Sequence, residues 1–534
     1  MTQVREPAAA VATARAARPP GPEAVTELAA LPRVTRRIRF SPGIGLQVPD
    51  PGTFVLVHQG RSGSPQRVSD WMLELLQRMA ADPVPEDELQ AGALGHGGPL
   101  GLFRWVESVR RLDAAGLIEH SCYLADELLC RLIGVGPGPS LAVEAFDPAA
   151  RQRVSPLALV TVQTGRGWVA QRPDSHLAVQ LGELGVRVLA AAADWTDWTA
   201  IEESTGIPGP LVRAVADQLC RASVLDQRPD ALPAKESGAP AAVDERDRWS
   251  TFDWWLHARS RGPRTTFGWA GSYPGRGRWD PLPPVPPRRA AVTLRLPVPD
   301  LTGLRQSGSD SLVEVMERRR SIREHDDAHP ITAAQLGELL YRTIRIRQTF
   351  PSEDGQTAVD RPVPNGGALH ELEVYPIVHR CAGVDSGMWH YRADSHELEW
   401  VADADHPGVG ALLAGAHAAY TMAATPQVVL VISARFGRVQ YKYDAIPYAL
   451  TLKNTGVLLA NLYLVATDMR LAGTAVGSGS QADFAAATGL DQFAEGSVGE
   501  FVVGSSTAAS QVSERFGEWE QHHGVPLPGD ASGA

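Results

Sequence analysis

A lysine and a tyrosine stand side by side at Lys442-Tyr443, between a predicted buried strand and a predicted long helix. An amine and a phenol can each remove a proton from a substrate, but both have pKa values of about 10 in water. Burial can lower the pKa of a lysine, and a neighbouring positive charge can lower that of a tyrosine. Lys442 could stabilise a Tyr443 phenolate or the roles could be reversed, and the pair alone also fits an ordinary surface position.

Two upstream segments carry groups that suit a flat ligand with a phosphate. Residues 318–323, Arg-Arg-Arg-Ser-Ile-Arg, stand at the end of a predicted helix. They offer guanidinium groups and a hydroxyl, which can hold phosphate by paired hydrogen bonds. Asn365-Gly366-Gly367 precedes a predicted strand, where paired glycines let the backbone approach a ring and the asparagine supplies a donor and an acceptor. Taken alone, the first segment fits a solvated helix end equally well, and the second is better explained as a plain turn.

A downstream glycine-rich run, residues 473–480, reads Gly-Thr-Ala-Val-Gly-Ser-Gly-Ser. Its small residues could admit a phosphate or one edge of a ring. The run lacks the order of a Walker A loop, and we expect it to follow a helix rather than a strand, which argues against ATP binding.

These segments fall within a pattern typical of a mixed α/β domain, which we predict over residues 311–520. Its longest predicted helix is apolar nearly all round, which predicts burial on every side, and such a helix often lies inside a dimer in this fold class. The expected elements are helices at 311–320, 333–343 and 446–468, strands at 371–378 and 388–391, and a buried strand at 428–432.

Residues 249–505 resemble the SagB-type azoline dehydrogenases, a branch of the FMN nitroreductase superfamily, because they carry these four segments in this order. The upstream run at 252–261, Phe-Asp-Trp-Trp-Leu-His-Ala-Arg-Ser-Arg, is similar to the entry segment of this branch. The resemblance implies a nitroreductase-like α/β fold, FMN as cofactor and a homodimer with the flavin site at its interface. It also implies oxidation of thiazoline and oxazoline rings to thiazoles and oxazoles in a ribosomally made peptide precursor, such as that of a thiopeptide, beside cyclodehydratase proteins.

The same resemblance implies roles for particular residues. The Arg-x-Ser-x-Arg, Lys-Tyr and helix Asn patterns of the family are present, while Asn365 stands where the family usually has Ser and Ala460 replaces a Gln. Residues 446–449 and 454–457 lack the charges of the family's Arg-x-Tyr-Arg and Glu-x-Gly-His runs. The implied cofactor-binding residues are Arg319, Ser321, Arg323, Asn365, Gly366, Gly367, Asn461, Gly477 and Ser478, and the implied catalytic residues are Lys442 and Tyr443.

The first half of the chain contains two segments of similar layout, residues 35–140 and 150–227. Each is predicted to have a strand, three helices and a closing strand, which is the layout of a winged-helix unit. Many such units bind DNA, but no basic recognition helix is present, and a variant binds leader peptides by strand addition at an exposed edge. We therefore expect tandem winged-helix-like, peptide-binding domains with strands at 54–58, 117–118, 157–162 and 224–225, and helices at 68–79, 85–89, 103–112, 177–190, near 201 and at 210–222.

The remaining segments are predicted to be linkers or tails. We expect flexible tails at residues 1–34 and 521–534 and a polar Pro/Ala-rich linker at 228–248. Residues 249–310 are expected to be an extended aromatic and proline-rich segment, in which the prolines of 281–287 exclude regular helix. Its aromatic residues could line a substrate groove, although packing against a domain is favoured.

Composition narrows the class of protein. The net charge of −11 argues against a general nucleic-acid binder. The sequence has neither an apolar run of about 18 residues nor a signal peptide, so we predict a cytoplasmic protein. The histidines are interpreted as structural, and no carboxylate–histidine set suggests a metal site. The cysteines are too irregularly spaced for a zinc site or a disulfide framework, so we expect buried free thiols at Cys122, Cys130, Cys220 and Cys381.

Three other functions stay open. An NAD(P)H-dependent FMN nitroreductase or quinone reductase would normally be a short single domain, which the long first half of this chain argues against. A non-catalytic leader-peptide scaffold would not need the intact Lys442-Tyr443 pair. A transcription factor with tandem winged helices is opposed by the acidic balance of the chain.

Overall fold

The computed structural model describes residues 34–58, 61–135, 147–229, 248–261, 271–306, 311–352, 355–419 and 424–507. The chain divides into two compact units, one of residues 1–258 with 262–268 and one of residues 259–261 with 269–534. The predicted tails (apart from Val34) and most of the predicted linker lie outside the described residues.

The first segment of the N-terminal unit places two helices against a small sheet. Its core consists of apolar side chains from β1, β3, α2 and α3, with Leu76, Met79 and Leu89 almost fully buried. The elements are β1 (Val34–Phe40), β2 (Ile44–Asp50), β3 (Thr53–His58), β4 (Arg61–Ser62), β5 (Gln66–Arg67), α2 (Asp70–Ala81), β6 (Val84–Pro85), α3 (Glu86–Ala114), β7 (Ile118–Leu124) and β8 (Glu127–Gly134).

The second segment joins the sheet of the first. One seven-stranded sheet has the order β10-β11-β12-β8-β7-β1-β6, so strands from both segments pair directly. The elements are β9 (Ala150–Val154), β10 (Leu159–Gln163), β11 (Gly167–Gln171), β12 (Leu177–Leu181), α4 (Glu183–Ala191), α5 (Trp198–Thr205), α6 (Gly209–Arg221) and β13 (Leu225–Pro229), followed by α7 (Thr251–Arg261).

One sequence prediction for this unit was wrong. Residues 177–190 are not one helix, because Leu177–Leu181 is a buried strand in the seven-stranded sheet and the helix starts only at Glu183. Gly182 makes the change of direction possible, since a Cβ there would lie 1.8 Å from the Leu128 carbonyl oxygen. The helices expected at 85–89 and 103–112 are the two parts of α3, which is interrupted at Gly98 (φ +59°, ψ −161°), directly before Pro99.

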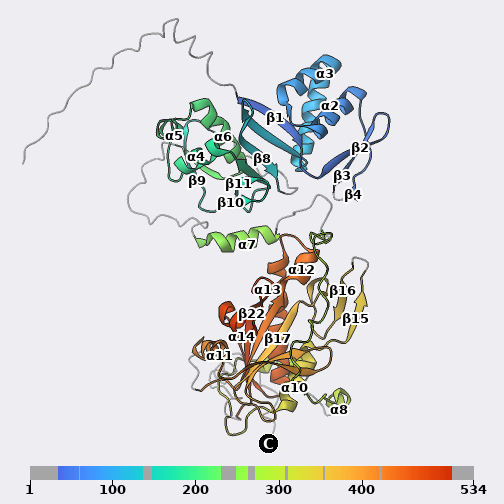
Figure 1. The fold of residues 1–534 in the computed structure, drawn as a ribbon, viewed down its shortest axis with the longest axis vertical. Coiled ribbons are helices and arrows are strands. Elements are labelled where there is room, and N and C mark those ends of the chain that lie inside the picture. Colours follow the sequence, from blue (N-terminus) through green and yellow to red (C-terminus); the bar gives the residue numbers. More distant parts are fainter. Residues whose placement is uncertain are drawn as a thin grey trace, which may run out of the picture. The chain divides into compact units, whose positions relative to one another are not determined.

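The C-terminal unit is a three-layer α/β domain, which confirms the predicted fold class (Figure 1). Its antiparallel seven-stranded sheet has the order β14-β19-β18-β17-β20-β22-β21. Helices α10 and α13 cover one face and α11 and α14 the other. The elements are β14 (Thr293–Arg295), α8 (Leu301–Gln306), α9 (Leu312–Arg318), α10 (Ala333–Ile344), β15 (Gln348–Pro351), β16 (Thr357–Asp360), η2 (Gly366–Ala368), β17 (Leu372–Val378), β18 (Gly387–Arg392), β19 (Glu397–Asp403), α11 (Pro407–Ala419), β20 (Val428–Arg435), α12 (Phe436–Lys442), α13 (Pro447–Asp468), β21 (Ala472–Val476), α14 (Gln481–Thr488) and β22 (Glu495–Gly504).

The glycine-rich run 473–480 differs from its prediction. Its first four residues belong to β21, so the loop at Gly477 follows a strand rather than a helix. The four cysteines are free and buried, as predicted.

The long helix α13 is less enclosed than its sequence predicts. Only one stripe, including Leu458, Leu462 and Ala466, is buried, whereas Tyr448 is 48% and Leu452 37% exposed. The helix is also long and apolar enough to cross a membrane by composition, a test that core helices of soluble proteins pass as well. The prediction of burial on every side is therefore wrong for the single chain.

Candidate active site

The predicted catalytic pair lies at the end of α12. Lys442 is the last residue of this helix and Tyr443 caps it. The Tyr443 phenol lies against the predicted glycine turn, since a Cβ on Gly367 would be 2.5 Å from the phenolic oxygen. Gly367 also adopts φ +72°, which an L-residue rarely does. The structure therefore brings the Lys-Tyr motif and the Asn-Gly-Gly motif together.

A buried carboxylate holds the glycine turn in place. The side chain of Asn365 donates to Glu371 Oε2 at 2.8 Å, and its oxygen accepts from the His370 amide at 3.0 Å. Asn454 of α13 donates to Glu371 Oε1 at 2.8 Å and accepts from the Gly366 amide at 3.1 Å. The nitrogen and the oxygen of the Asn365 side-chain amide are therefore both hydrogen-bonded within the protein. Neither Glu371 nor Asn454 belongs to the site residues predicted from the sequence.

Left-handed backbone conformations gather around this pair. Four of the eight described non-glycine residues with positive φ are Tyr273, Ala368, His370 and Ala445, with φ between 48° and 65°. Each such conformation costs about 1–3 kcal/mol and persists only where the surroundings enforce it. Their concentration beside Lys442 makes this region the candidate active site.

Tyr273 is a further residue at the site that the sequence analysis did not assign. Its amide donates to the Lys442 carbonyl at 3.0 Å, and the Gly275 amide donates to the Tyr441 carbonyl at 3.2 Å. Lys442 Nζ lies 6.0 Å from the centroid of the Tyr273 ring and 5.7 Å from that of the Tyr443 ring. At these distances both rings can attract the ammonium group. The glycine-rich stretch 271–277 was the available signal for a tight turn here.

The predicted phosphate-binding residues lie beside β21. The Ser321 hydroxyl is 2.8 Å from the Tyr463 hydroxyl, which also accepts from the Ala475 amide at 2.8 Å. The Arg319 guanidinium lies 5.4 Å from the centre of the Tyr463 ring. The backbone of Ile322 bonds to Gly473, which fixes the segment against the strand. Tyr463, which the sequence analysis missed, therefore joins the first motif to the glycine-rich run.

The loop after β21 exposes Gly477 and Ser478 above a buried acid. Glu500 of β22 is only 2% exposed, and its Oε1 has no hydrogen-bond partner among the described residues. A Cβ on Gly479 would lie 3.0 Å from this oxygen. Burial raises the pKa of Glu500 to about 7. A carboxyl that is neutral below this pH would not repel an anion bound at the loop.

The two groups of predicted residues lie at different points along α13. Asn454 contacts the glycine turn and Tyr463 contacts the Arg319–Ser321 segment, so roughly 13 Å of helix separates them. Predicted Asn461 lies between them and donates to the Val457 carbonyl of its own helix at 2.9 Å. Predicted Arg323 is exposed near the second group.

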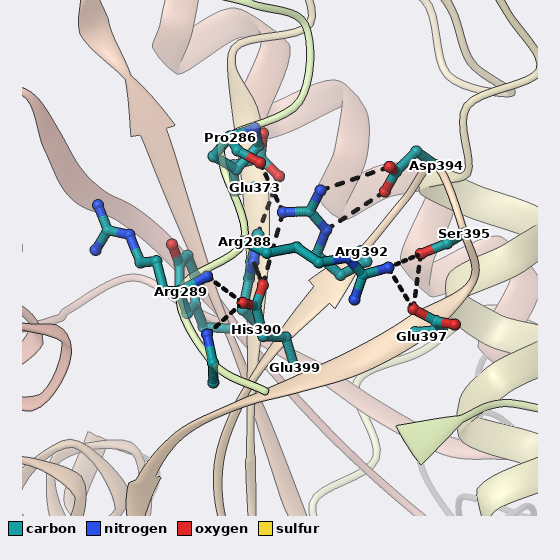
Figure 2. Close-up of polar contacts among 12 residues, drawn as sticks. Pro286, Arg288, Arg289, Glu373, His390, Arg392, Asp394, Ser395, Glu397 and Glu399 are labelled. Atoms are coloured by element: carbon teal, nitrogen blue, oxygen red, sulfur yellow. Dashed lines mark hydrogen bonds and ion pairs between the residues drawn. The ribbon is translucent and has the colours of Figure 1, made fainter. Parts of the chain in front are cut away.

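A buried polar network joins β17, β18 and β19 and fixes an extended segment. His390 contacts Glu373 at 3.2 Å and Glu399 at 3.7 Å (Figure 2). Burial opposes the charged imidazole, but the two carboxylates outweigh it and raise the pKa of His390. Glu399 accepts from the amides of Arg289 and Ala290, and its pKa is lowered to about 2, chiefly by His390.

The arginines around this network also bind the proline-rich segment. Arg392 donates to the Pro286 carbonyl at 2.6 Å, and Arg435 donates to the Pro284 carbonyl at 3.4 Å (Figure 2 shows the first). The prediction that residues 281–287 are not helical is confirmed. Because its groups bind one another and this segment, we interpret the network as structural.

Comparison with known proteins agrees with the C-terminal geometry. Residues 316–505 match the nitroreductase family. Over 186 residues, the chain is 27% identical to a candidate nitroreductase of Methanocaldococcus jannaschii. The matched region covers 35% of this chain and 85% of that protein. Residues 316–505 therefore form a nitroreductase family domain. Proteins of this family are generally flavin-dependent oxidoreductases.

Solved structures of low similarity were also found. The E. coli microcin synthetase McbBCD complex with truncated pro-MccB17 bound is 21% identical, with 41% of this chain and 77% of that chain covered and a TM-score of 0.31. A candidate nitroreductase in complex with FMN from Desulfovibrio desulfuricans is 15% identical, with 41% and 99% covered and a TM-score of 0.26.

Proposed function

We propose that the chain is an FMN-dependent dehydrogenase that oxidises thiazoline and oxazoline rings to thiazoles and oxazoles in a ribosomally made peptide precursor. The observation that carries the proposal is the Lys442-Tyr443 pair, held by strained turns with its phenol against Gly367 in a nitroreductase family domain. A base beside a flat, glycine-lined surface is what removal of an acidic ring proton requires.

The residues of this domain fit FMN by their donor chemistry. Arg319 and Arg323 supply guanidinium groups and Ser321 and Ser478 supply hydroxyls, all of which suit a phosphate monoester. The exposed backbone at Gly477 and the left-handed Gly367 suit the close approach of a flat ring. Bound FMN would supply the two-electron acceptor that no side chain provides.

The chain's own residues would hold the ring and move one proton. Conversion of an azoline to an azole removes a proton from the α-carbon, which the adjoining C=N and carbonyl acidify, and a hydride equivalent from the β-carbon. Lys442 Nζ or the Tyr443 phenolate oxygen accepts the α-proton. The Tyr273 and Tyr443 rings attract the charged Lys442 ammonium, which suits a positive charge beside a Tyr443 phenolate that acts as the base. In the reverse assignment Lys442 acts as the neutral amine and Tyr443 supports it.

The first half of the chain and the partner proteins also have roles in the proposed function. We propose that the tandem winged-helix-like segments bind the peptide precursor, and that cyclodehydratase proteins deliver it in the cytoplasm. We also propose a homodimer, because α13 leaves Tyr448 and Leu452 exposed, and α9 leaves Val313 69% and Met316 58% exposed. Apolar faces of this kind commonly mark an interface between subunits. A partner covering α13 would also span the distance between the two groups of site residues.

The test starts with the visible spectrum of the purified protein, followed by aerobic incubation with an azoline-bearing peptide. We expect bound flavin and a mass loss of about 2 Da per ring, the mass of two hydrogens. Lys442→Ala and Tyr443→Phe should lower the rate by roughly 10²–10⁴. Arg295→Ala is the control, because Arg295 is an exposed cation of β14, outside the pair and outside the helices α9 and α13.

Other outcomes favour other functions. Bound flavin, rapid NAD(P)H oxidation and unchanged peptide mass would favour an NAD(P)H-dependent nitroreductase instead. A colourless protein that added FMN cannot restore would overturn the flavin proposal and favour a non-catalytic scaffold.

A further inference from the structure

The first segment of the N-terminal unit contains an open groove of about 830 Å³. Its floor is apolar and well packed, with Phe54, Met72 and Leu76 each less than 9% exposed. One wall is the turn from Gly63 to Ser69, and the opposite wall is the second half of α3. The groove lies within a single segment of the chain and contains none of the residues proposed for oxidation.

The wall formed by residues 61–67 is the edge of a small sheet. β4 and β5 pair with β3 on their inner side, and no further strand of the described chain pairs with their outer side. An unpaired edge beside an apolar floor suits an extended peptide, which can add as a strand and place alternate side chains in the groove. A compact small molecule would not need such an edge.

The rim of the groove is positively charged in an otherwise acidic protein. Its charged residues are three arginines, Arg67, Arg104 and Arg111, and one glutamate, Glu107. Glu107 pairs with Arg111 at 3.2 Å and with Arg110, which lies outside the groove, at 3.0 Å. Arg67 and Arg104 are exposed and have no carboxylate partner among the described residues. These two cations stand on opposite walls of the groove.

An exposed aromatic side chain completes the rim. Phe103 of α3 lines the groove and is 67% exposed, which is unusual for a phenylalanine that no neighbour covers. Leu100, one turn earlier on the same helix, is 60% exposed but does not line the groove. The difference between these two residues gives a matched pair for mutagenesis.

We propose that this groove binds an extended segment of the peptide substrate, with apolar side chains at alternate positions and acidic side chains between or beside them. The apolar side chains occupy the floor and contact Phe103, and the acidic ones pair with Arg67 and Arg104. That the bound peptide is the enzyme's substrate rests on the proposed function. The segment bound in the groove is a part of that peptide outside the rings that are oxidised.

The test measures fluorescence anisotropy of a short fluorescein-labelled peptide in which leucine and glutamate alternate, titrated with the full-length protein. We expect binding that weakens with salt, and no binding of the same peptide with lysine in place of glutamate. Arg104→Glu and Phe103→Ala should each weaken binding roughly ten-fold. The controls Arg78→Glu and Leu100→Ala should leave the affinity unchanged, because neither residue lines the groove and Arg78 pairs with Glu88, which does not line it either.

Equal binding of the two peptides would overturn the proposal, as would equal losses in the groove variants and their controls. The oxidation of a minimal azoline peptide without the acidic segment is measured separately. Arg104→Glu should not change it, whereas Lys442→Ala should. A failure of the enzymatic proposal in that assay is therefore distinguishable from a failure of the groove to bind acidic peptide.

Discussion

The buried acid beneath the glycine loop makes a quantitative prediction about stability and pH. Glu500 is almost fully buried, one of its oxygens has no hydrogen-bond partner among the described residues, and burial raises its pKa from 4.5 to about 7. Between these pH values the unfolded chain has lost the proton that the folded chain keeps. The folded state therefore binds more protons, and the free energy of unfolding falls as the pH rises from about 4.5 to about 7.

The magnitude follows from the size of the shift. A pKa difference of about 2.5 units corresponds to about 3 kcal/mol, because each unit is worth about 1.4 kcal/mol. Glu500→Gln removes the ionisation but keeps the shape of the side chain. Any fixed cost of the amide cancels when the variant is compared with the wild type at two pH values. For a domain of this size, about 3 kcal/mol corresponds to roughly 6–12 °C in melting temperature.

The assay is differential scanning calorimetry of the flavin-free protein from about pH 5 to about pH 8. We expect the melting temperature of Glu500→Gln, relative to wild type, to rise by several degrees across this range. Glu324→Gln, at an exposed carboxylate, is the control and should show a much smaller trend. A difference between Glu500→Gln and wild type that stays constant with pH would refute the reasoning.

Three further predictions follow from the C-terminal unit. Tyr273→Leu should slow ring oxidation roughly ten-fold and Tyr273→Phe should restore it, because the ring attracts the Lys442 ammonium; equal rates for both variants in the mass assay would contradict this. The raised pKa of His390 means that its pairing with Glu373 stabilises the fold below about pH 6.5 and is lost as the pH rises through the folded pKa. His390→Gln should therefore lower the melting temperature more at about pH 6 than at about pH 9, and equal losses would count against a charged His390. Ala460→Arg, on the exposed face of α13, should convert the proposed dimer to monomer in light scattering, and an unchanged mass would exclude this face from the interface.

The sequence predicted the C-terminal elements well because their periodicity is strong. The helix at 333–343 and the strands at 371–378 and 428–432 are found within three residues of their expected ends. The weakest prediction was residues 177–190, where an apolar run with a glycine could be read as a helix. This run is a strand between β11 and β8, and its pairing with the more distant β8 leaves no local signal in the sequence.

The sequence also indicated which residues carry chemistry, but not the residues that position them. Lys442, Tyr443 and Gly367 are found together, as their motifs imply. Tyr273 and Glu371 were missed, since neither belongs to a motif. Tyr273 reaches Lys442 only because its segment folds back over the end of α12, a contact between residues far apart in the chain.

The strained turns around Lys442 require a clamp, and Arg438 provides it. Arg438 is fully buried and donates from its three nitrogens to the carbonyls of Leu369, Leu282 and Thr357 at 2.7–2.8 Å. These carbonyls belong to the glycine-turn region, the proline-rich segment and β16, so one guanidinium joins three segments that surround the site. A buried charge is stabilising only when its hydrogen bonds are complete, and each left-handed residue nearby costs about 1–3 kcal/mol. The geometry of the Lys-Tyr pair therefore depends on an arginine that takes no part in the reaction, which explains why residue types and spacing locate the chemistry here but cannot specify its geometry.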